Sequence, residues 1–174
     1  MVDSGLTFTP RFEKAMRTIW SPTHEGQADK FDPDDPGGRT YYGIAQKFNP
    51  DFDWINPTPE KAKAQFWKKY WALTRFEEIE EECLAIRLFD NGIVIGIPTA
   101  IKLLQQILNF YWSTDFSPAE DGVCGSKTLA AVNLLDGNMV EALWQSACAI
   151  HYISRKKEKY IKGWLLRLFD THEY

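Results

Sequence analysis

The 174-residue sequence lacks a long apolar run: the longest, at residues 93–97, contains a glycine and stops at Pro98. A helix needs about 20 apolar residues to cross a bilayer, so the sequence predicts no stable membrane insertion. Its first residues, MVDSGLTFTPRFEK, contain no apolar segment typical of a signal peptide. We therefore expect synthesis in the cytoplasm, with any target outside it reached by assisted export or cell lysis.

Cysteine is also scarce. The three cysteines, Cys83, Cys124 and Cys148, form no Cys-x-x-Cys pair and cannot all pair with one another. Reduced thiols are the simplest interpretation, and Cys83 and Cys148 are expected in the core. The histidines lie at no recognised metal-ligand spacing, so we expect no metal, and no other cofactor is implied.

An excess of basic charge is missing as well, since the formal net charge is −4. The only basic run, at residues 155–159, falls at the end of a predicted helix, where cations favour the negative end of the helix dipole. We interpret this run as a solvated face. The acidic balance argues against a nucleic-acid partner, although a helical regulatory or nucleic-acid module stays open as an alternative.

Apolar residues at helical spacing fill most of the chain. Hydrophobic residues make up 44% of it and aromatic residues 14%, more rings than a core of this size needs, so some are expected to line a surface groove. Thr9-Pro10 and Thr58-Pro59 each resemble a cap followed by a first-turn proline, which predicts helices from about residues 10 to 20 and from residue 58. Five further helices are predicted. One ends near residues 91–92, the next begins at Pro98, and the others cover residues 125–132, 140–150 and 164–169.

Residues 24–57 break this helical pattern. The stretch is rich in Asp, Gly, Pro and Asn, which predicts long loops with a small β-hairpin around Gly37-Gly38. Loops of this length inside a compact domain are uncommon unless they are functional. The sequence thus predicts an all-α fold with one long loop region, divided into a first lobe over residues 1–95 and a second helical lobe over residues 96–174.

A group of carboxylic acids opens the loop region. Glu25 follows the first helix, close to Trp20, and four aspartates come after it: Asp29, Asp32, Asp34 and Asp35. Glycoside hydrolysis needs a protonated carboxylic acid and often a second carboxylate, and burial beside an aromatic ring raises the pKa of a glutamic acid. An Asp-rich loop with glycines is more often a plain turn or a calcium site than a catalytic one, although the EF-hand spacing is not met.

The order of several short motifs resembles one enzyme family. Glu25-Gly26, followed by Asp35-Pro36-Gly37-Gly38-x-Thr40-x-x-Gly43-Ile44, is similar to the hallmark of the N-acetylmuramidases of glycoside hydrolase family 108, which are phage lysins and secretion-associated murein hydrolases. Further matches follow in order: Tyr70-Trp71, Phe89-Asp90-Asn91-Gly92, the Leu-Leu-Gln within residues 100–106, Asp121-Gly122-x-x-Gly125-x-x-Thr128-Leu129 and Gly163-Trp164-x-x-Arg167. Together they span roughly residues 10 to 170.

The resemblance implies a lysozyme-like, mostly helical fold and a peptidoglycan hydrolase that cuts the β-1,4 bond between N-acetylmuramic acid and N-acetylglucosamine. It assigns the catalytic acid to Glu25 and makes Asp35 and Thr40 active-site loop residues. The second half of the chain resembles the helical peptidoglycan-binding module that usually completes these enzymes. The implied partner is the glycan strand of the cell wall.

Four further residues are candidates for the site. Tyr42, with Thr40, is expected to position water or sugar hydroxyls. Tyr70 and Trp71 are candidates for stacking on sugar rings, although their helical spacing with Phe66 and Trp67 predicts that at least two of these four belong to the core. Asp90 follows a buried run, where either a supporting role in the site or a hydrogen-bonded structural role fits.

The sequence departs from the family pattern at its first motif, because the usual E-G-G-Y reads Glu25-Gly26-Gln27-Ala28. Pro22 precedes it, and Ala149 stands where an arginine is usual. The acid itself is retained. The departure keeps one alternative in view, a non-catalytic peptidoglycan-binding or secretion-accessory protein.

Overall fold

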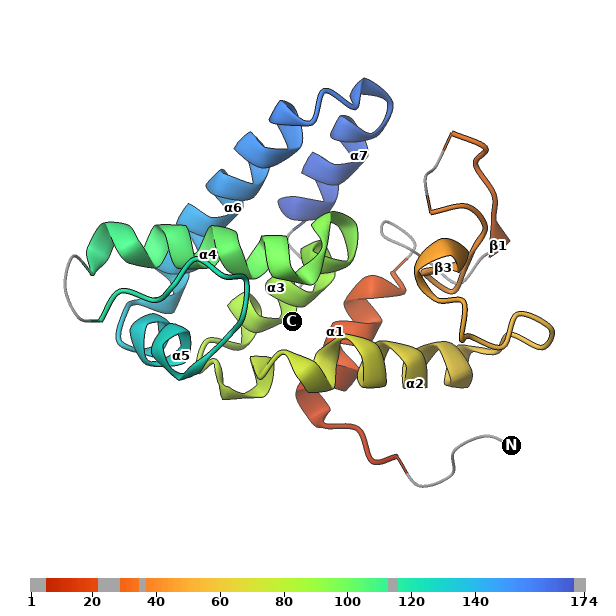
Figure 1. Ribbon diagram of the computed structural model, residues 1–174, viewed down its shortest axis with the longest axis horizontal. Helices are drawn as coiled ribbons and strands as arrows, with labels where there is room; N and C mark the ends of the chain where they lie inside the picture. The colour runs from red at the N-terminus through yellow and green to blue at the C-terminus, as the bar shows by residue number, and fades with distance from the viewer. Residues whose placement is uncertain (1–5, 22–28, 35–36, 113–115, 171–174) are drawn as a thin grey trace. The chain divides into compact units, whose positions relative to one another are not determined.

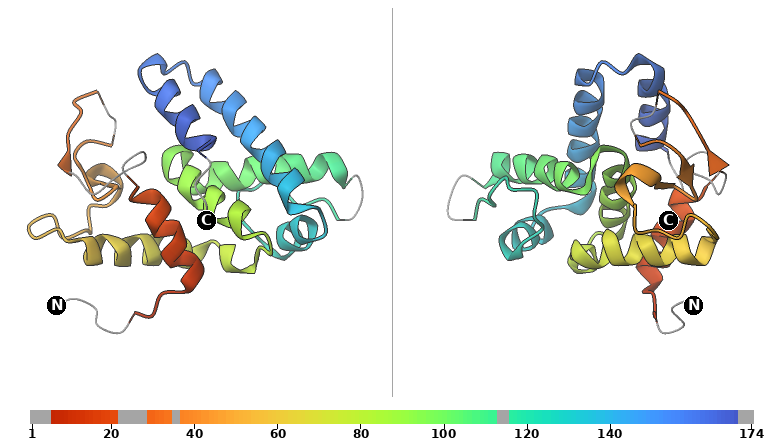
Figure 2. Two further views of the ribbon diagram at one scale, coloured as in Figure 1. Left: turned by 180° about the vertical axis from the view of Figure 1, so that it is seen from behind. Right: turned by 45° about the vertical axis from the view of Figure 1, so that its right-hand side comes forward.

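The computed structural model describes residues 6–21, 29–34, 37–112 and 116–170 (Figures 1 and 2). Packing divides the chain into two compact units, residues 1–73 and residues 74–174. The division of roles between residues 1–95 and 96–174 stays a prediction, since it concerns function rather than packing.

The first unit contains two α-helices in its described part, α1 (Pro10–Ile19) and α2 (Pro59–Lys69). Both begin as the sequence predicts. The hydroxyl oxygens of Thr9 and Thr58 each accept a hydrogen bond from the backbone N–H three residues later, at 3.2 and 3.3 Å, and a proline fills the first turn. Each cap satisfies an N–H that has no partner within the helix.

The core of the first unit is built around aromatic rings. Phe12 of α1 packs against Trp67 and Trp71, with ring centroids 5.0 and 5.5 Å apart. The other fully buried apolar side chains come from both helices and from the loop region: Ala15, Met16, Ile19, Ile44, Ala62 and Phe66. This packing holds one face of α1 against α2, and Ile44 adds the loop region to the same core.

A small antiparallel sheet forms within the loop region, from β1 (Asp29–Lys30), β2 (Thr40–Tyr41) and β3 (Ile44–Ala45), in that order. Asp29 pairs with Tyr41, and Tyr41 pairs with Ile44. The predicted hairpin around Gly37-Gly38 is confirmed as the β1–β2 pair. The third strand was not predicted, because two-residue strands carry too little alternation to be seen in a sequence.

The second unit is a helical bundle. Its described helices are α3 (Glu82–Ile95), α4 (Ile97–Tyr111), α5 (Ser126–Asn133), α6 (Gly137–Ser154) and α7 (Glu158–Leu168). Trp144 of α6 is fully buried and donates from its indole Nε1 to the carbonyl oxygen of Ala100 at 3.0 Å, which fastens α6 to α4. None of the helices within the described ranges has both the length and the apolar character needed to cross a bilayer.

The prediction that α3 ends near residues 91–92 is wrong, because the helix continues to Ile95. Gly92 lies inside the helix, where a Cβ would come within 2.6 Å of the side chain of Ile97. It is therefore a packing glycine rather than a helix terminator. The helix ends at Gly96, whose φ of +91° is a conformation that side chains with a Cβ rarely adopt.

All three cysteines are free thiols. Cys148 is buried as predicted. Cys83, predicted in the core, is only half-buried, and the second buried cysteine is Cys124. Cys83 stands in the first turn of α3, one position away from the buried row that starts at Leu84. Burial raises the pKa of the Cys124 thiol to about 11, so this group stays protonated at neutral pH.

Gln105 of α4 organises the loop that leads into α5. Its side chain is buried and donates from Nε2 to a carboxylate oxygen of Asp121 at 2.9 Å, to the carbonyl oxygen of Val123 at 2.9 Å and to the hydroxyl of Thr128 at 3.2 Å. Its Oε1 accepts from the backbone N–H of Gly122 at 2.9 Å. The Leu-Leu-Gln and Asp-Gly-x-x-Gly-x-x-Thr motifs are therefore two halves of one structural contact.

Gln105→Leu keeps the volume of this side chain but leaves the buried N–H of Gly122 without its acceptor. We expect the free energy of unfolding to fall by about 2–3 kcal/mol, the usual cost of a buried group that loses its partner. Urea unfolding measures it. The matched control is Gln106→Leu on the same helix, whose amide has one exposed contact, to Glu120. Equal losses for the two variants would show that Gln105 does not hold the loop.

Candidate active site

The turn between β2 and β3 has an unusual backbone. Tyr42 and Gly43 occupy its two central positions with φ values of 53° and 81°, while Tyr41 pairs with Ile44 on either side. Two positive φ values in a two-residue hairpin loop define a type I′ turn, in which glycine is favoured and a tyrosine is sterically costly. Such a conformation persists only where the surroundings hold it, which is a common feature of functional sites.

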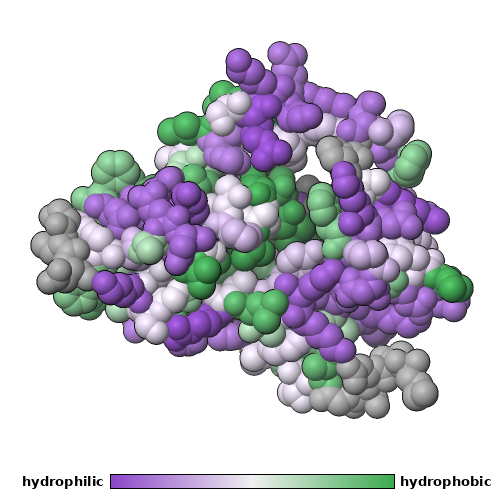
Figure 3. Space-filling view, in the orientation of Figure 1, coloured by the Kyte–Doolittle hydropathy of each residue, from purple (hydrophilic) through white to green (hydrophobic). Residues whose placement is uncertain are grey.

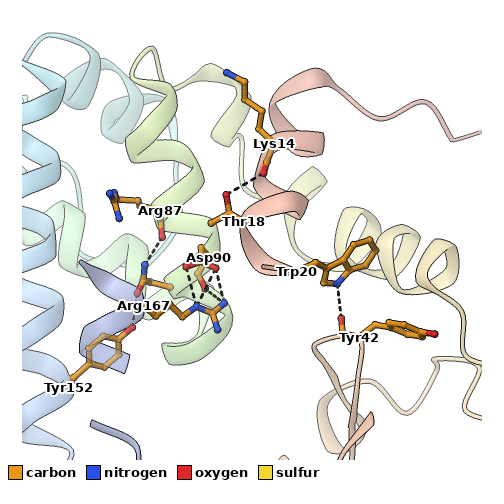
Figure 4. Close-up of polar contacts among 9 residues, drawn as sticks. Lys14, Thr18, Trp20, Tyr42, Arg87, Asp90, Tyr152 and Arg167 are labelled. Carbon is orange, nitrogen blue, oxygen red and sulfur yellow. Dashed lines mark hydrogen bonds and ion pairs between the residues drawn. The ribbon is translucent and has the colours of Figure 1, made fainter. Parts of the chain in front are cut away.

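The contact that holds this turn comes from α1. Trp20, which caps the C-terminus of the helix, donates from its indole Nε1 to the carbonyl oxygen of Tyr42 at 3.0 Å (Figure 4). The indole is half-buried. The end of α1 and the tip of the β2–β3 hairpin are thereby joined, although they lie 22 residues apart in the sequence.

Two predicted site residues, Glu25 and Asp35, lie outside the described residues. The chain is described up to Ser21, whose backbone N–H donates to Thr18 at 3.1 Å, and again from Asp29, which pairs with β2. Both flanks of the segment that carries Glu25 are thus fastened to the first unit.

Asp29, the first aspartate of the described loop, forms an ion pair with Arg39. The guanidinium of Arg39 donates to both carboxylate oxygens of Asp29, at 2.8 and 2.5 Å, and also lies over the ring of Tyr41, 5.7 Å from its centroid. The hydrogen bonds from Arg39 lower the pKa of Asp29, so that this carboxyl is ionised at neutral pH. Asp29 is therefore no proton donor.

Asp32 shows the plain turn role that the sequence left open for this group of acids. One of its carboxylate oxygens accepts from the backbone N–H of Asp34 at 3.0 Å, two residues on. This is the local contact by which aspartate stabilises a turn.

Thr40 and Tyr42 lie on the β2–β3 hairpin, whose tip accepts the hydrogen bond from Trp20. Thr40 pairs with Lys30 and Ala45 in the sheet, and both Thr40 and Tyr42 are half-buried, so each keeps part of its side chain accessible. The consecutive residues Thr40, Tyr41 and Tyr42 therefore bring three hydroxyl groups to this hairpin. The ring centroids of Tyr41 and Tyr42 lie 4.8 Å apart.

Tyr70 belongs to a hydrogen-bonded cluster that sequence reasoning missed. Its hydroxyl donates to the side-chain oxygen of Asn49 at 3.3 Å, and the amide of Gln65 donates to the same atom at 3.3 Å. Asn49 is buried, and its Nδ2 donates to the carbonyl oxygen of Ala45 at 3.0 Å. The end of β3 is thereby tied to α2. An asparagine before proline reads as a turn residue in sequence, and nothing in it marks a buried one.

Trp71 corrects one prediction. Its side chain is 1% exposed and packs against Phe12, so the ring is not available to stack on a sugar. Phe66 is buried with it, which confirms that two of the four neighbouring aromatic residues belong to the core. Tyr70 remains half-buried and is kept in the proposed site.

Asp90 has a structural role. It is 2% exposed and lies on α3, where the guanidinium of Arg167 donates to both of its carboxylate oxygens and to its carbonyl oxygen at 2.7–3.2 Å (Figure 4). The next residue, Asn91, accepts from the hydroxyl of Tyr152 at 2.9 Å. These two motif residues fasten α3 to α7 and α6, and Asp90 is removed from the set of supporting site residues.

In the described part of the chain, no three His, Cys, Asp or Glu side chains come together in a group that could hold a metal ion.

Comparisons with known proteins give a family match over part of the chain and a structural match over most of it. Residues 20–96 match the family model described as Glycosyl hydrolase 108, a segment that starts at Trp20 and includes the sheet, α2 and α3. No curated protein matches the chain significantly. The structure titled "Structure of Brucella abortus SagA" is similar, with 23% sequence identity and a TM-score of 0.73 over 90% of this chain and 88% of that one. The predicted lysozyme-like, mostly helical fold is thereby confirmed.

Trp20→Phe keeps a ring at the end of α1 and removes the donor to Tyr42. We expect the free energy of unfolding to fall by about 1 kcal/mol, the net value of a typical hydrogen bond, and amide exchange at residues 40–45 to speed up. Hydrogen exchange with mass spectrometry measures the exchange rate at residues 40–45, and urea unfolding measures the free energy of unfolding. Trp54→Phe is the control, because it removes a similar bond, at 2.9 Å to Asn49. Equal exchange at residues 40–45 in both variants would contradict the assignment.

Arg167→Met leaves the buried carboxylate of Asp90 without a cation. We expect a loss of about 3–5 kcal/mol in the free energy of unfolding, as for other broken buried pairs. The double variant Asp90→Leu/Arg167→Met should recover much of that loss, because it removes both buried charges. Thermal and urea unfolding of the three proteins provide the comparison. A double variant as unstable as Arg167→Met would show that the loss comes from packing and not from the unpaired charge.

Proposed function

We propose that this chain is a glycoside hydrolase of family 108, a peptidoglycan hydrolase of lysozyme type, and that Glu25 is its general acid. In this proposal the bond cleaved is the β-1,4 link between N-acetylmuramic acid and N-acetylglucosamine. The observation that carries it is the bond from Trp20 to Tyr42, which fastens the start of the Glu25 segment to the hairpin that bears the second family motif.

The proposed chemistry needs one acid that keeps its proton near neutral pH. Glu25 protonates the glycosidic oxygen as the leaving group departs, and positive charge develops on the sugar ring. A half-buried indole at Trp20, five residues before Glu25, supplies an apolar surface of the kind that disfavours an ionised carboxyl.

The developing charge also needs an ionised carboxylate or a positioned water. Asp29 is ionised, but Arg39 already neutralises its charge, so its effect on a nearby cation is weakened. We therefore assign the supporting carboxylate to Asp35. The hydroxyls of Thr40 and Tyr42 are assigned to water or sugar hydroxyls, which their partial exposure allows.

One further residue of the first unit, Tyr70, is part of the proposed site. Tyr70 orders the end of β3 through Asn49 and, because it is only half-buried, is assigned a sugar contact. Trp71 and Asp90 are left out of the site, because Trp71 is buried in the core and Asp90 is paired with Arg167. Residues 96–174 are assigned a peptidoglycan-binding role, and the protein acts on the cell wall after assisted export or lysis, as a lysin or a secretion-associated hydrolase.

Glu25→Gln is the decisive variant, since it removes the proton and nearly preserves the shape. We expect release of soluble muropeptides from isolated sacculi to fall by about 10²–10⁴-fold, the usual contribution of a general acid, while pelleting with sacculi is unchanged. Muropeptides with new reducing ends are quantified by chromatography.

Glu80→Gln is the matched control, an exposed glutamate in the second unit. Full activity of Glu25→Gln would overturn the assignment of the acid. The altered Glu25-Gly26-Gln27-Ala28 segment favours one other outcome, in which the natural protein pellets with sacculi and releases nothing. That result identifies a binding protein and refutes the proposed reaction.

A further inference from the structure

The turn between α6 and α7 carries a cluster of positive charge that the proposed reaction does not use. Five cations lie within or beside it, and the only acid among them is Glu158. We call these five residues the basic tip: Arg155, Lys156, Lys157, Lys159 and Lys162. The chain as a whole carries a net charge of −4, so positive charge is strongly concentrated here. A local excess of this kind attracts anionic partners.

The helix dipole accounts for only part of the cluster. Arg155 caps the C-terminus of α6, where a cation is favourable. Lys157 is the N-cap residue of α7 and Lys159 lies in its first turn, at the end of a helix where a cation is unfavourable. The interpretation of the whole run as a helix-end charge is therefore incomplete.

The side chains of the basic tip are exposed and mostly without ion pairs. Four of them, Arg155, Lys156, Lys157 and Lys162, make no ion pair with any acid in the ranges that the structure describes. Lys159 lies over the ring of Tyr160, with its Nζ 5.4 Å from the centroid. Repulsion among these like charges is relieved when an anionic surface binds.

Lys156 is also in a strained conformation. Its φ is 52°, and its backbone N–H donates to Ile153 at 3.2 Å, so it occupies the left-handed position that follows a helix. Glycine is the usual residue there, because a Cβ is sterically costly. A lysine at this position keeps a cation at the tip at the expense of stability.

Two exposed isoleucines lie next to the basic tip on α6. Ile150 and Ile153 are 69% and 58% exposed and stand three residues apart, which places them on one face of the helix. The buried side of α6 is a different face, formed by Trp144, Cys148 and Tyr152. In Figure 3 the top of the molecule, where Figure 1 shows the α6–α7 turn, is mostly purple, with green residues beside it over α6.

We propose that the basic tip, together with Ile150 and Ile153, docks on the surface of an anionic phospholipid membrane. The cations contact lipid phosphates, and the isoleucines enter the boundary between headgroups and acyl chains. The exposed isoleucines favour a membrane over the glycan, because peptidoglycan offers anionic carboxylates but no apolar layer for them to enter. This attachment is peripheral and goes beyond the proposed hydrolase function.

The first test compares vesicles of pure phosphatidylcholine with vesicles of equal parts phosphatidylcholine and phosphatidylglycerol, by co-sedimentation of the whole chain. We expect binding to the anionic vesicles only, weakened by added salt. Lys157→Glu/Lys159→Glu should lower the affinity at least about tenfold, since each cation near an anionic membrane changes it by roughly fivefold. Lys102→Glu/Lys127→Glu is the matched control, with the same change in charge on α4 and α5, and its affinity should be no more than about threefold weaker than that of the natural chain.

Two further variants separate docking from folding. Lys156→Gly should weaken vesicle binding while the unfolding temperature stays the same or rises, because glycine suits the left-handed backbone. Ile150→Ser/Ile153→Ser should weaken vesicle binding and leave pelleting with sacculi unchanged. Neither measurement depends on catalysis, so the outcome is independent of the Glu25 proposal.

Three results would overturn the docking proposal. The first is equal binding to neutral and anionic vesicles. The second is an equal loss in the control pair on α4 and α5. The third is that the basic-tip variants lose binding to sacculi but not to vesicles, which assigns the tip to the glycan and its peptide carboxylates instead.

Discussion

One hydrogen bond, from the indole of Trp20 to the carbonyl oxygen of Tyr42, sets the geometry on which the proposed chemistry depends. Neither residue is the one that stability alone would favour at its position. Tyr42 has a positive φ that suits glycine, and Trp20 ends its helix half-buried. Their pairing fixes a turn in which the following Gly43 completes the type I′ conformation. A strained turn held by a distant side chain is the arrangement expected where position matters more than stability.

The parts of the fold that sequence could predict are those with local causes. Threonine–proline caps at residues 9 and 58, the glycine-rich hairpin and the apolar rows of the helices each act within a few residues, and each was found where predicted. The failures have non-local causes. Whether Gly92 ends a helix depends on Ile97, and whether Trp71 is accessible depends on Phe12. Periodicity cannot distinguish a buried ring from one that lines a groove.

The same distinction separates the candidate residues of the site. Family motifs mark positions without saying what each does, and the structure divides them. Gln105 holds the loop at Gly122, and Asp90 pairs with Arg167, although sequence alone left Asp90 open to a role in catalysis. A buried carboxylate beside a guanidinium satisfies a packing requirement, and its pairing across 77 residues is not visible in any local pattern.

Charge in the second unit follows two opposite rules. Inside it, Asp90 and Arg167 neutralise each other, and Arg87 pairs with Glu141 while donating to Leu168 and so fastening the end of α7. At the α6–α7 turn, cations are placed beside one another and at an unfavourable helix end instead. A sequence whose interior charges are paired this fully does not gain stability from the exposed repulsion at Lys157. The two patterns therefore have different causes, one in the fold and the other in a partner with negative charge.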